Sequence, residues 1–180
     1  VEPWPVLTPD EQRRLEEVAW RFATTPRWEA AKGFEVTDDV VAVISGQAAL
    51  MALGLPDDVF REVGSVLVHP TTVVMRGEHS PVEGIVSDDP TPVHGEAHWQ
   101  GPVLIAWDAV IDDLEHPGDG ANVVHHELAH KLDMLDGTVD GTPPLGSRDR
   151  LDRWVEVCTE VYEAVAVGEG GEVLDPYAGD

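Results

Sequence analysis

The spacing of apolar residues predicts two helices in the first third of the chain. Residues 9–24 carry apolar side chains at helical intervals. Thr8 and Glu11 have the spacing of a capping box at the start of this helix. Residues 38–53, preceded by Thr37 as the cap, are apolar around almost the whole helical circumference. A helix of that kind is usually buried, so we expect the second helix to lie in the core.

Two more helices are predicted in the last third. The first covers the stretch NVVHHELAHKLDMLDG, residues 122–137, and the second runs from the cap Ser147 to about Val167. The second has an apolar stripe that we expect to face the core. Its members are Leu151, Trp154, Val155, Cys158 and Val161.

Strands are predicted where β-branched residues cluster. Residues 65–75 read as a strand interrupted at Pro70, and residues 101–111 read as a second strand. Segments rich in Gly, Pro and Asp predict loops or turns at 77–101, 115–121 and 137–147. Helices around a small group of strands indicate the α+β class.

The helix of residues 122–137 carries the motif His-Glu-x-x-His, from His126 to His130. At about 100° per residue the two histidines lie about 40° apart, one turn above the other. Two imidazoles so placed bind one tetrahedral Zn²⁺ at about 2.0–2.1 Å. Glu127 lies to the side, where a carboxylate accepts a proton from metal-bound water, whose pKa zinc lowers to about 7.

The rest of this helix separates into two faces. Val124, Leu128, Leu132 and Leu135 fall opposite the two motif histidines and are expected to anchor the helix to the core. His125 is turned by about 100° from His126 and is not expected to be a ligand. The alternative is that the motif arose by chance and the histidines form a plain surface pair.

Catalytic zinc needs a third protein ligand and one open position. Asp136 occupies the third-ligand place of a longer metalloprotease pattern, but the glycine of that pattern is replaced here by Asp133. The other candidate source is a later helix. Asp133 shares the face of the histidines, where it is either a hydrogen-bond partner of His130 or a solvated charge.

Composition narrows the classes of function. The chain of 180 residues fits one domain, and its formal charge of −24 disfavours binding to nucleic acids or anionic membranes. No apolar run is long enough to span a bilayer. Cys158 is the lone cysteine, which excludes an intrachain disulfide and favours a cytoplasmic location.

Several stretches resemble the Mlc titration factor A family of bacterial zinc peptidases: ISGQAALMALGLP, VLVHP, GEAHWQGPV, GPVLIAWDAVI, NVVHHELAHKLDMLDGTVDGTPPL and LDPYA. The resemblance covers most of the chain from about residue 28. It implies a gluzincin-like domain similar to the catalytic domain of anthrax lethal factor, with aminopeptidase-like activity. By this resemblance His126 and His130 bind zinc, Glu127 is the general base, and Tyr177 stabilises the oxyanion.

One departure from the family concerns the third ligand, which the resemblance places on a glutamate a few residues beyond the tyrosine. The sequence stops at Asp180 without such a segment. We therefore expect residues 1–180 to form a single zincin-like domain, truncated before the third zinc ligand. Such a form should hold zinc weakly and be a poor enzyme.

The leading hypothesis for function is a zinc-dependent peptidase acting on peptide or protein substrates. The rival is a regulatory protein that sequesters a transcriptional repressor, as the resemblance implies for enteric bacteria. A weaker rival is a structural metal site without chemistry. Trp107 is expected to help line the cleft, on a strand that pairs with the substrate backbone by β-augmentation.

Overall fold

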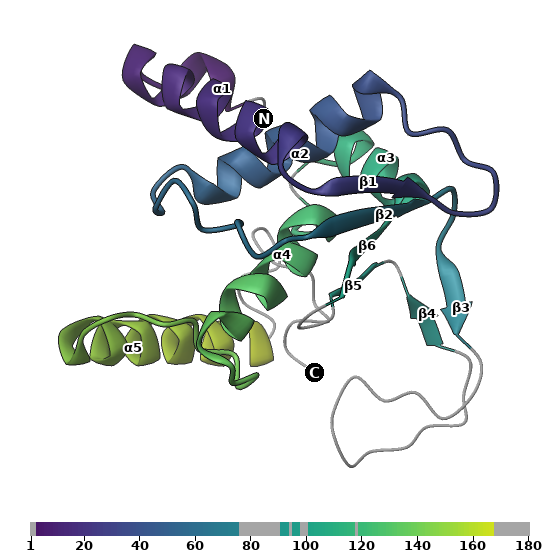
Figure 1. Ribbon diagram of the computed structural model, residues 1–180. Coiled ribbons are helices and arrows are strands. Elements are labelled where there is room, and N and C mark those ends of the chain that lie inside the picture. The colour runs from purple at the N-terminus through teal and green to yellow at the C-terminus, as the bar shows by residue number, and fades with distance from the viewer. Residues whose placement is uncertain (1–2, 76–90, 94, 98–100, 118, 168–180) are drawn as a thin grey trace.

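The computed structural model describes residues 3–75, 91–93, 95–97, 101–117 and 119–167 as a mixed α+β arrangement (Figure 1). The helical elements are η1 (Trp4–Val6), α1 (Pro9–Thr24), α2 (Asp38–Ala52), α3 (Trp107–Glu115), α4 (Val123–Asp133), η2 (Met134–Asp136) and α5 (Arg148–Ala166). The strands are β1 (Arg27–Ala30), β2 (Ser65–His69), β3 (Val73–Met75), β4 (Thr91–Val93), β5 (Gly95–Ala97) and β6 (Val103–Ala106).

A small sheet organises these elements. Its strand order is β1-β2-β6-β5, with β1, β2 and β6 parallel and β5 antiparallel to β6. A separate antiparallel pair joins β3 to β4. Helix α4 packs against β5, β6 and α2, and α1 packs along α2. The helix that carries the motif therefore lies beside the antiparallel edge of the sheet (Figure 1).

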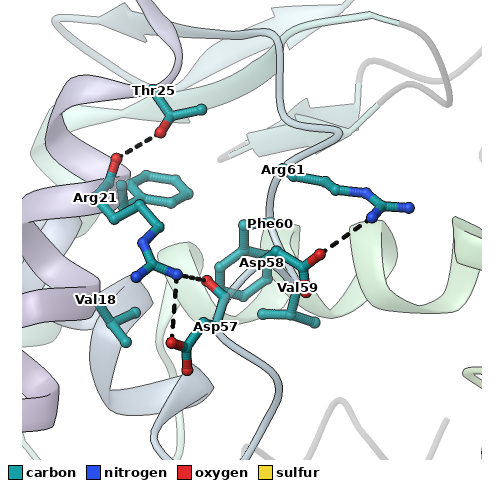
Figure 2. A pocket seen from close by; sticks show the side chains of 9 residues that line it. Val18, Arg21, Thr25, Asp57, Asp58, Val59, Phe60 and Arg61 are labelled. Atoms are coloured by element: carbon teal, nitrogen blue, oxygen red, sulfur yellow. Dashed lines mark hydrogen bonds and ion pairs between the residues drawn. The ribbon is translucent and has the colours of Figure 1, made fainter.

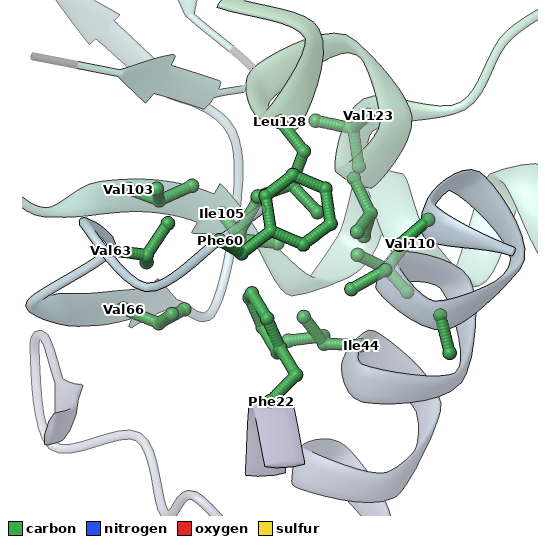
Figure 3. Packing of buried hydrophobic residues seen from close by; sticks show 14 of the residues in the cluster. Phe22, Ile44, Phe60, Val63, Val66, Val103, Ile105, Val110, Val123 and Leu128 are labelled. Carbon is green, nitrogen blue, oxygen red and sulfur yellow. The ribbon is translucent and has the colours of Figure 1, made fainter. Parts of the chain in front are cut away.

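The core forms where the central strands meet the helices (Figure 3). Val66 and Val68 from β2 and Val103 and Ile105 from β6 are almost completely buried. Leu128 reaches the same cluster from α4. Each such side chain stabilises the fold by about 1.5–3 kcal/mol through burial. Packing of β2 and β6 therefore also fixes the position of α4.

Predictions that rested on local capping chemistry are confirmed. The capping box of Thr8 and Glu11 is formed at the start of α1. Thr37 accepts the N–H of Val40 at the start of α2, and Ser147 accepts the N–H of Arg150 at the start of α5. The predicted interruption between residues 65 and 75 separates β2 from β3.

The predicted strand over residues 101–111 is wrong in its second half. β6 ends at Ala106 and α3 begins at Trp107. The carboxylate of Asp108 accepts the N–H groups of Thr72 and Ala109, which ties this helix start to the segment after β2. β6 also lies between β2 and β5, so it is not available for β-augmentation. Among the described strands, β5 is the edge strand of this sheet that lies next to α4.

The predicted burial of the α5 stripe is also wrong. Helix α5 contains no buried residue, and Figure 1 shows it projecting away from the sheet. Val155 and Tyr162 expose 55% and 58% of their surface, and Cys158 is exposed. An amphipathic pattern predicts a helix, but it does not say what covers the apolar face.

Arginines from α1 hold the turn that follows α2. Arg14 donates to the carbonyls of Leu53 and Leu55 and to the carboxylate of Asp57. Figure 2 shows Arg21 reaching the same aspartate, beside a hollow of about 70 Å³ lined by Val18 and other residues of α1 and of the turn. The hydrogen bond from Arg14 is the main reason that the pKa of Asp57 is lowered.

We expect Arg14→Met to lower the free energy of unfolding by about 1–3 kcal/mol, because two partly buried carbonyls lose their donor. Because the pKa of Asp57 is lowered in the folded chain, the Arg14–Asp57 interaction contributes to the free energy of unfolding at pH values above the ordinary pKa of 3.8. This contribution is lost as the pH falls below that value. Urea denaturation of both forms between pH 3 and 7 measures the difference, which should shrink in acid. Arg13→Met is the control, since Arg13 pairs only with Asp10 in the described part of the chain.

Candidate metal centre

Helix α4 begins at the cap residue Asn122, and it has one face in the core and another face in solvent. The Oδ1 atom of Asn122 accepts the N–H of His125 at 2.9 Å, which fixes the first turn. Val123, Val124 and Leu128 are buried, while His126 and His130 are exposed. The predicted separation of faces is thus confirmed for the helix itself, but Leu135 lies beyond it in η2 and is 41% exposed.

The two motif histidines converge on one point. Their Nε2 atoms are 3.1 Å apart, and their ring centroids are 4.7 Å apart with an interplanar angle of 85°. This edge-on arrangement directs both Nε2 atoms to the same position above the helix. The prediction that the two rings act together is consistent with this geometry.

The separation of the nitrogens fits a shared zinc ion. Two ligand bonds of about 2.0–2.1 Å at the tetrahedral angle hold their nitrogens about 3.3–3.4 Å apart. The observed 3.1 Å needs only a small movement of either ring to reach this value. His126 and His130 are therefore suited to hold the metal.

Electrostatics favour the metal-binding form of His126. Partial burial, and then the proximity of His130, lower the pKa of the His126 imidazole. Only a neutral imidazole has a lone pair for a metal. The environment of His126 therefore keeps this imidazole neutral further into the acid range than an ordinary histidine.

Glu127 and Lys131 are buried on the neighbouring side of α4, about 100° around the helix axis from the two histidines. They expose only 3% and 6% of their surface. The ammonium of Lys131 donates to the carbonyl of Gly101 at 3.1 Å, and burial lowers its pKa. This contact links α4 to the residues just before β6. Glu127 directly follows His126 in the sequence, so its side chain starts about 100° around the helix axis from the His126 imidazole.

Contacts from neighbouring helices fix the start of α4, and sequence reasoning missed them. The ring Nε2 of His125 lies 3.0 Å from the carbonyl of Gln47, and the Asn122 amide donates to the Gln47 side chain. Asp113 of α3 accepts the N–H of Val123 at 2.7 Å. Gln47 is a long polar residue inside a helix predicted to be apolar all round. A polar residue in that position was the one sign in the sequence that α2 makes a polar contact with another segment.

The three other candidate residues near the motif, His125, Asp133 and Asp136, differ in burial and in their contacts. His125 contacts the Gln47 carbonyl of α2, which agrees with the prediction that it points away from His126, and burial lowers its pKa. Asp133 exposes only 7% of its surface, so its interpretation as a solvated charge is wrong. Asp136 is exposed, and its Oδ1 accepts the N–H of Thr138 at 2.9 Å.

Other predicted site residues are not part of this geometry. Trp107 starts α3 and packs against Phe34, with ring centroids 6.3 Å apart, instead of extending a strand beside the site. Tyr177 lies outside the described residues. In the described ranges no group of three His, Cys, Asp or Glu side chains is arranged to hold a metal ion. A hollow lined by Asp136, Pro143 and Leu151 follows α4 but is not lined by either motif histidine.

Comparison with known proteins places this chain in a family. The family model described as glucose-regulated metallo-peptidase M90 matches residues 2–180. An uncharacterized protein of Synechocystis is 33% identical over 95% of this chain and 64% of its own length. The Mlc titration factor A proteins of Serratia proteamaculans and Salmonella agona are 30% and 31% identical, over 97% and 96% of this chain.

These relatives are longer than this chain. The chain spans 69% and 66% of the two Mlc titration factors, which is about two thirds of their length. None of the described helices is long and apolar enough to cross a bilayer. The match over nearly every residue, together with the paired histidines on α4, shows that the chain belongs to the M90 family of glucose-regulated metallopeptidases.

Proposed function

We propose that this chain carries the metal-binding part of a zinc-dependent peptidase with aminopeptidase-like activity. The observation that carries the proposal is the convergence of the His126 and His130 Nε2 atoms, 3.1 Å apart, beside the buried carboxylate of Glu127. Bound zinc would supply Lewis acidity and lower the pKa of water to about 7. The ligand chemistry of two neutral imidazoles suits this ion.

Two residues of the chain would then take part in the reaction, one in proton transfer and one in stabilising the oxyanion. Glu127 would accept a proton from the attacking water and return it to the leaving amine of the peptide. The hydroxyl of Tyr177 would donate to the developing oxyanion, as the family resemblance implies. The substrate would be a peptide, and its backbone would pair with β5, which among the described strands is the edge strand next to α4.

The remaining parts of this proposal rest on the resemblance. The catalytic domain would be a single gluzincin-like unit similar to that of anthrax lethal factor. A glutamate is favoured as the third ligand over Asp136, whose Oδ1 is already engaged by Thr138. A cytoplasmic location is supported by the lone cysteine, Cys158.

A second function, binding of a repressor, is favoured by the surface of α5. The relatives' name, Mlc titration factor A, points to the repressor Mlc as a protein partner. Exposed apolar side chains line α5, and a contiguous surface of this kind often marks a protein interface. They include Val155, Val157, Val161 and Tyr162. The strongly acidic chain would favour a basic surface on the partner.

Replacing both motif histidines by alanine should abolish stoichiometric zinc binding, because the two convergent imidazole ligands are lost. Metal content after equilibration with buffered zinc measures this effect. His116→Ala is the matched control: its ring is exposed and pairs with Asp112 at the end of α3. Equal zinc content in the double variant and the control would contradict the proposed site.

Glu127→Gln should reduce peptide hydrolysis by about 10²–10⁴-fold, because the amide cannot accept the proton from water. Zinc content should stay within twofold of the wild type. Hydrolysis of fluorogenic aminoacyl and peptide substrates measures the effect, with Glu163→Gln on exposed α5 as control. A variant that retains full activity would exclude Glu127 as the base.

The repressor hypothesis has a separate test on α5. Val155→Glu combined with Val161→Glu should weaken binding of purified Mlc by at least tenfold, because two charges enter the apolar face. Zinc content should not change. Val139→Glu is the control, since Val139 is 62% exposed in the loop after η2. Unchanged binding in the double variant would exclude this face as the interface.

A further inference from the structure

Asp133, the last residue of α4, is a carboxylate in an unfavourable place. It exposes only 7% of its surface, and its Oδ1 atom has no hydrogen-bond partner in the part of the chain that the structure describes. Burying an ionised carboxylate without a partner destabilises a fold. The C-terminal end of a helix also repels negative charge. A leucine at this position would destabilise the folded chain less, so stability does not explain the presence of a carboxylate here.

The position of Asp133 on α4 suggests that reason. By helical geometry Asp133 lies about 60° from His130 and about 20° from His126, on the face that carries both imidazoles. Side chains on a helix lean toward its N-terminus, so the Asp133 carboxylate leans over the turn that contains His130. Residues three apart have Cβ atoms about 5–6 Å from each other. A rotation of the Asp133 side chain therefore brings it within reach of the His130 ring.

The orientation of the His130 ring determines which nitrogen such a carboxylate would meet. Nε2 of His130 is directed at Nε2 of His126, 3.1 Å away. When Nε2 binds a metal, the proton of the neutral ring is on Nδ1. Metal-binding histidines usually donate this second N–H to a carboxylate, a carbonyl or water, which fixes the tautomer and the angle of the ring.

We propose that Asp133 is the positioning residue for His130, accepting the Nδ1–H of this ring so that Nε2 presents its lone pair to the metal. The inference rests on the proposed metal site. Asp133 does not itself bind the metal, because its short side chain starts one turn beyond His130. In the described residues no hydrogen bond joins Asp133 to His130, so the contact requires the side-chain rotation described above, with or without a bound metal.

The test compares Asp133→Leu and Asp133→Asn with Asp149→Asn as control, because Asp149 is exposed in the first turn of α5. Zinc affinity is measured by competition with a chelator. The tautomer of His130 is measured by ¹⁵N NMR, with and without zinc, and thermal unfolding is followed for each zinc-free protein. Leucine removes the acceptor, whereas asparagine keeps a carbonyl oxygen in the same place.

We expect Asp133→Leu to weaken zinc binding by about 10–100-fold, the usual effect of removing such a partner. Asparagine should restore part of the affinity. The same leucine variant should unfold at a higher temperature than the wild type, because an apolar side chain replaces a buried carboxylate whose Oδ1 has no hydrogen-bond partner among the described residues. Lower affinity together with higher thermal stability is a combination that a purely structural role does not give.

Zinc affinity and His130 tautomer unchanged from the control in both Asp133 variants would overturn the proposal. Reduced thermal stability of the leucine variant with unchanged affinity would also overturn it. If the wild type binds no zinc, the proposed function fails. The tautomer in the zinc-free proteins then decides this inference: a loss of the Nδ1–H form in Asp133→Leu alone supports it, and no loss rejects it.

Discussion

The packing of α4 against β6 and α2 is the constraint on which the rest of the site depends. Val124 and Leu128 each expose only 1% of their surface. A helix turned by one residue, about 100°, would take Leu128 out of the core and direct an imidazole toward β6. The cost of exposing two aliphatic side chains, about 3–6 kcal/mol, therefore sets the rotation of α4. With that rotation, His126 and His130 face outward together.

Rotation alone does not fix the helix along its axis, and polar contacts at its two ends do so. At the first turn, Asn122 and His125 hold Gln47 of α2, and Asp113 of α3 accepts a backbone N–H. Near the last turn, Lys131 holds the carbonyl of Gly101. The motif histidines lie between these two anchors. Their nitrogen separation is thus set by the pitch of one helix, while the helix is held by three other segments.

The parts of this structure that could be predicted from sequence are those decided within a few residues. Thr8, Thr37 and Ser147 mark helix starts because a hydroxyl bonds a backbone N–H three residues ahead. The outward pairing of His126 and His130 follows from helical pitch in the same way. The failure at residues 101–111 has a different origin. A short apolar segment is compatible with either a strand or a buried helix. The change from β6 to α3 is accompanied by a contact between Asp108 and Thr72, which lie 36 residues apart in the sequence.

Tertiary contacts also decide which polar residues are buried, and here the pattern of the sequence was least informative. Glu127, Lys131 and Asp133 of α4 are buried, whereas Val155, Val161 and Tyr162 of α5 are exposed. Both features run against the usual partition of polar and apolar groups, and both reduce the stability of the folded chain. Such local conflicts concentrate where a protein binds something. Buried charge next to two imidazoles suits a cation and its water, and exposed apolar surface on a separate helix suits another polypeptide. Because the two conflicts lie on different elements, the proposed metal chemistry and the proposed protein binding can be altered independently in this fold.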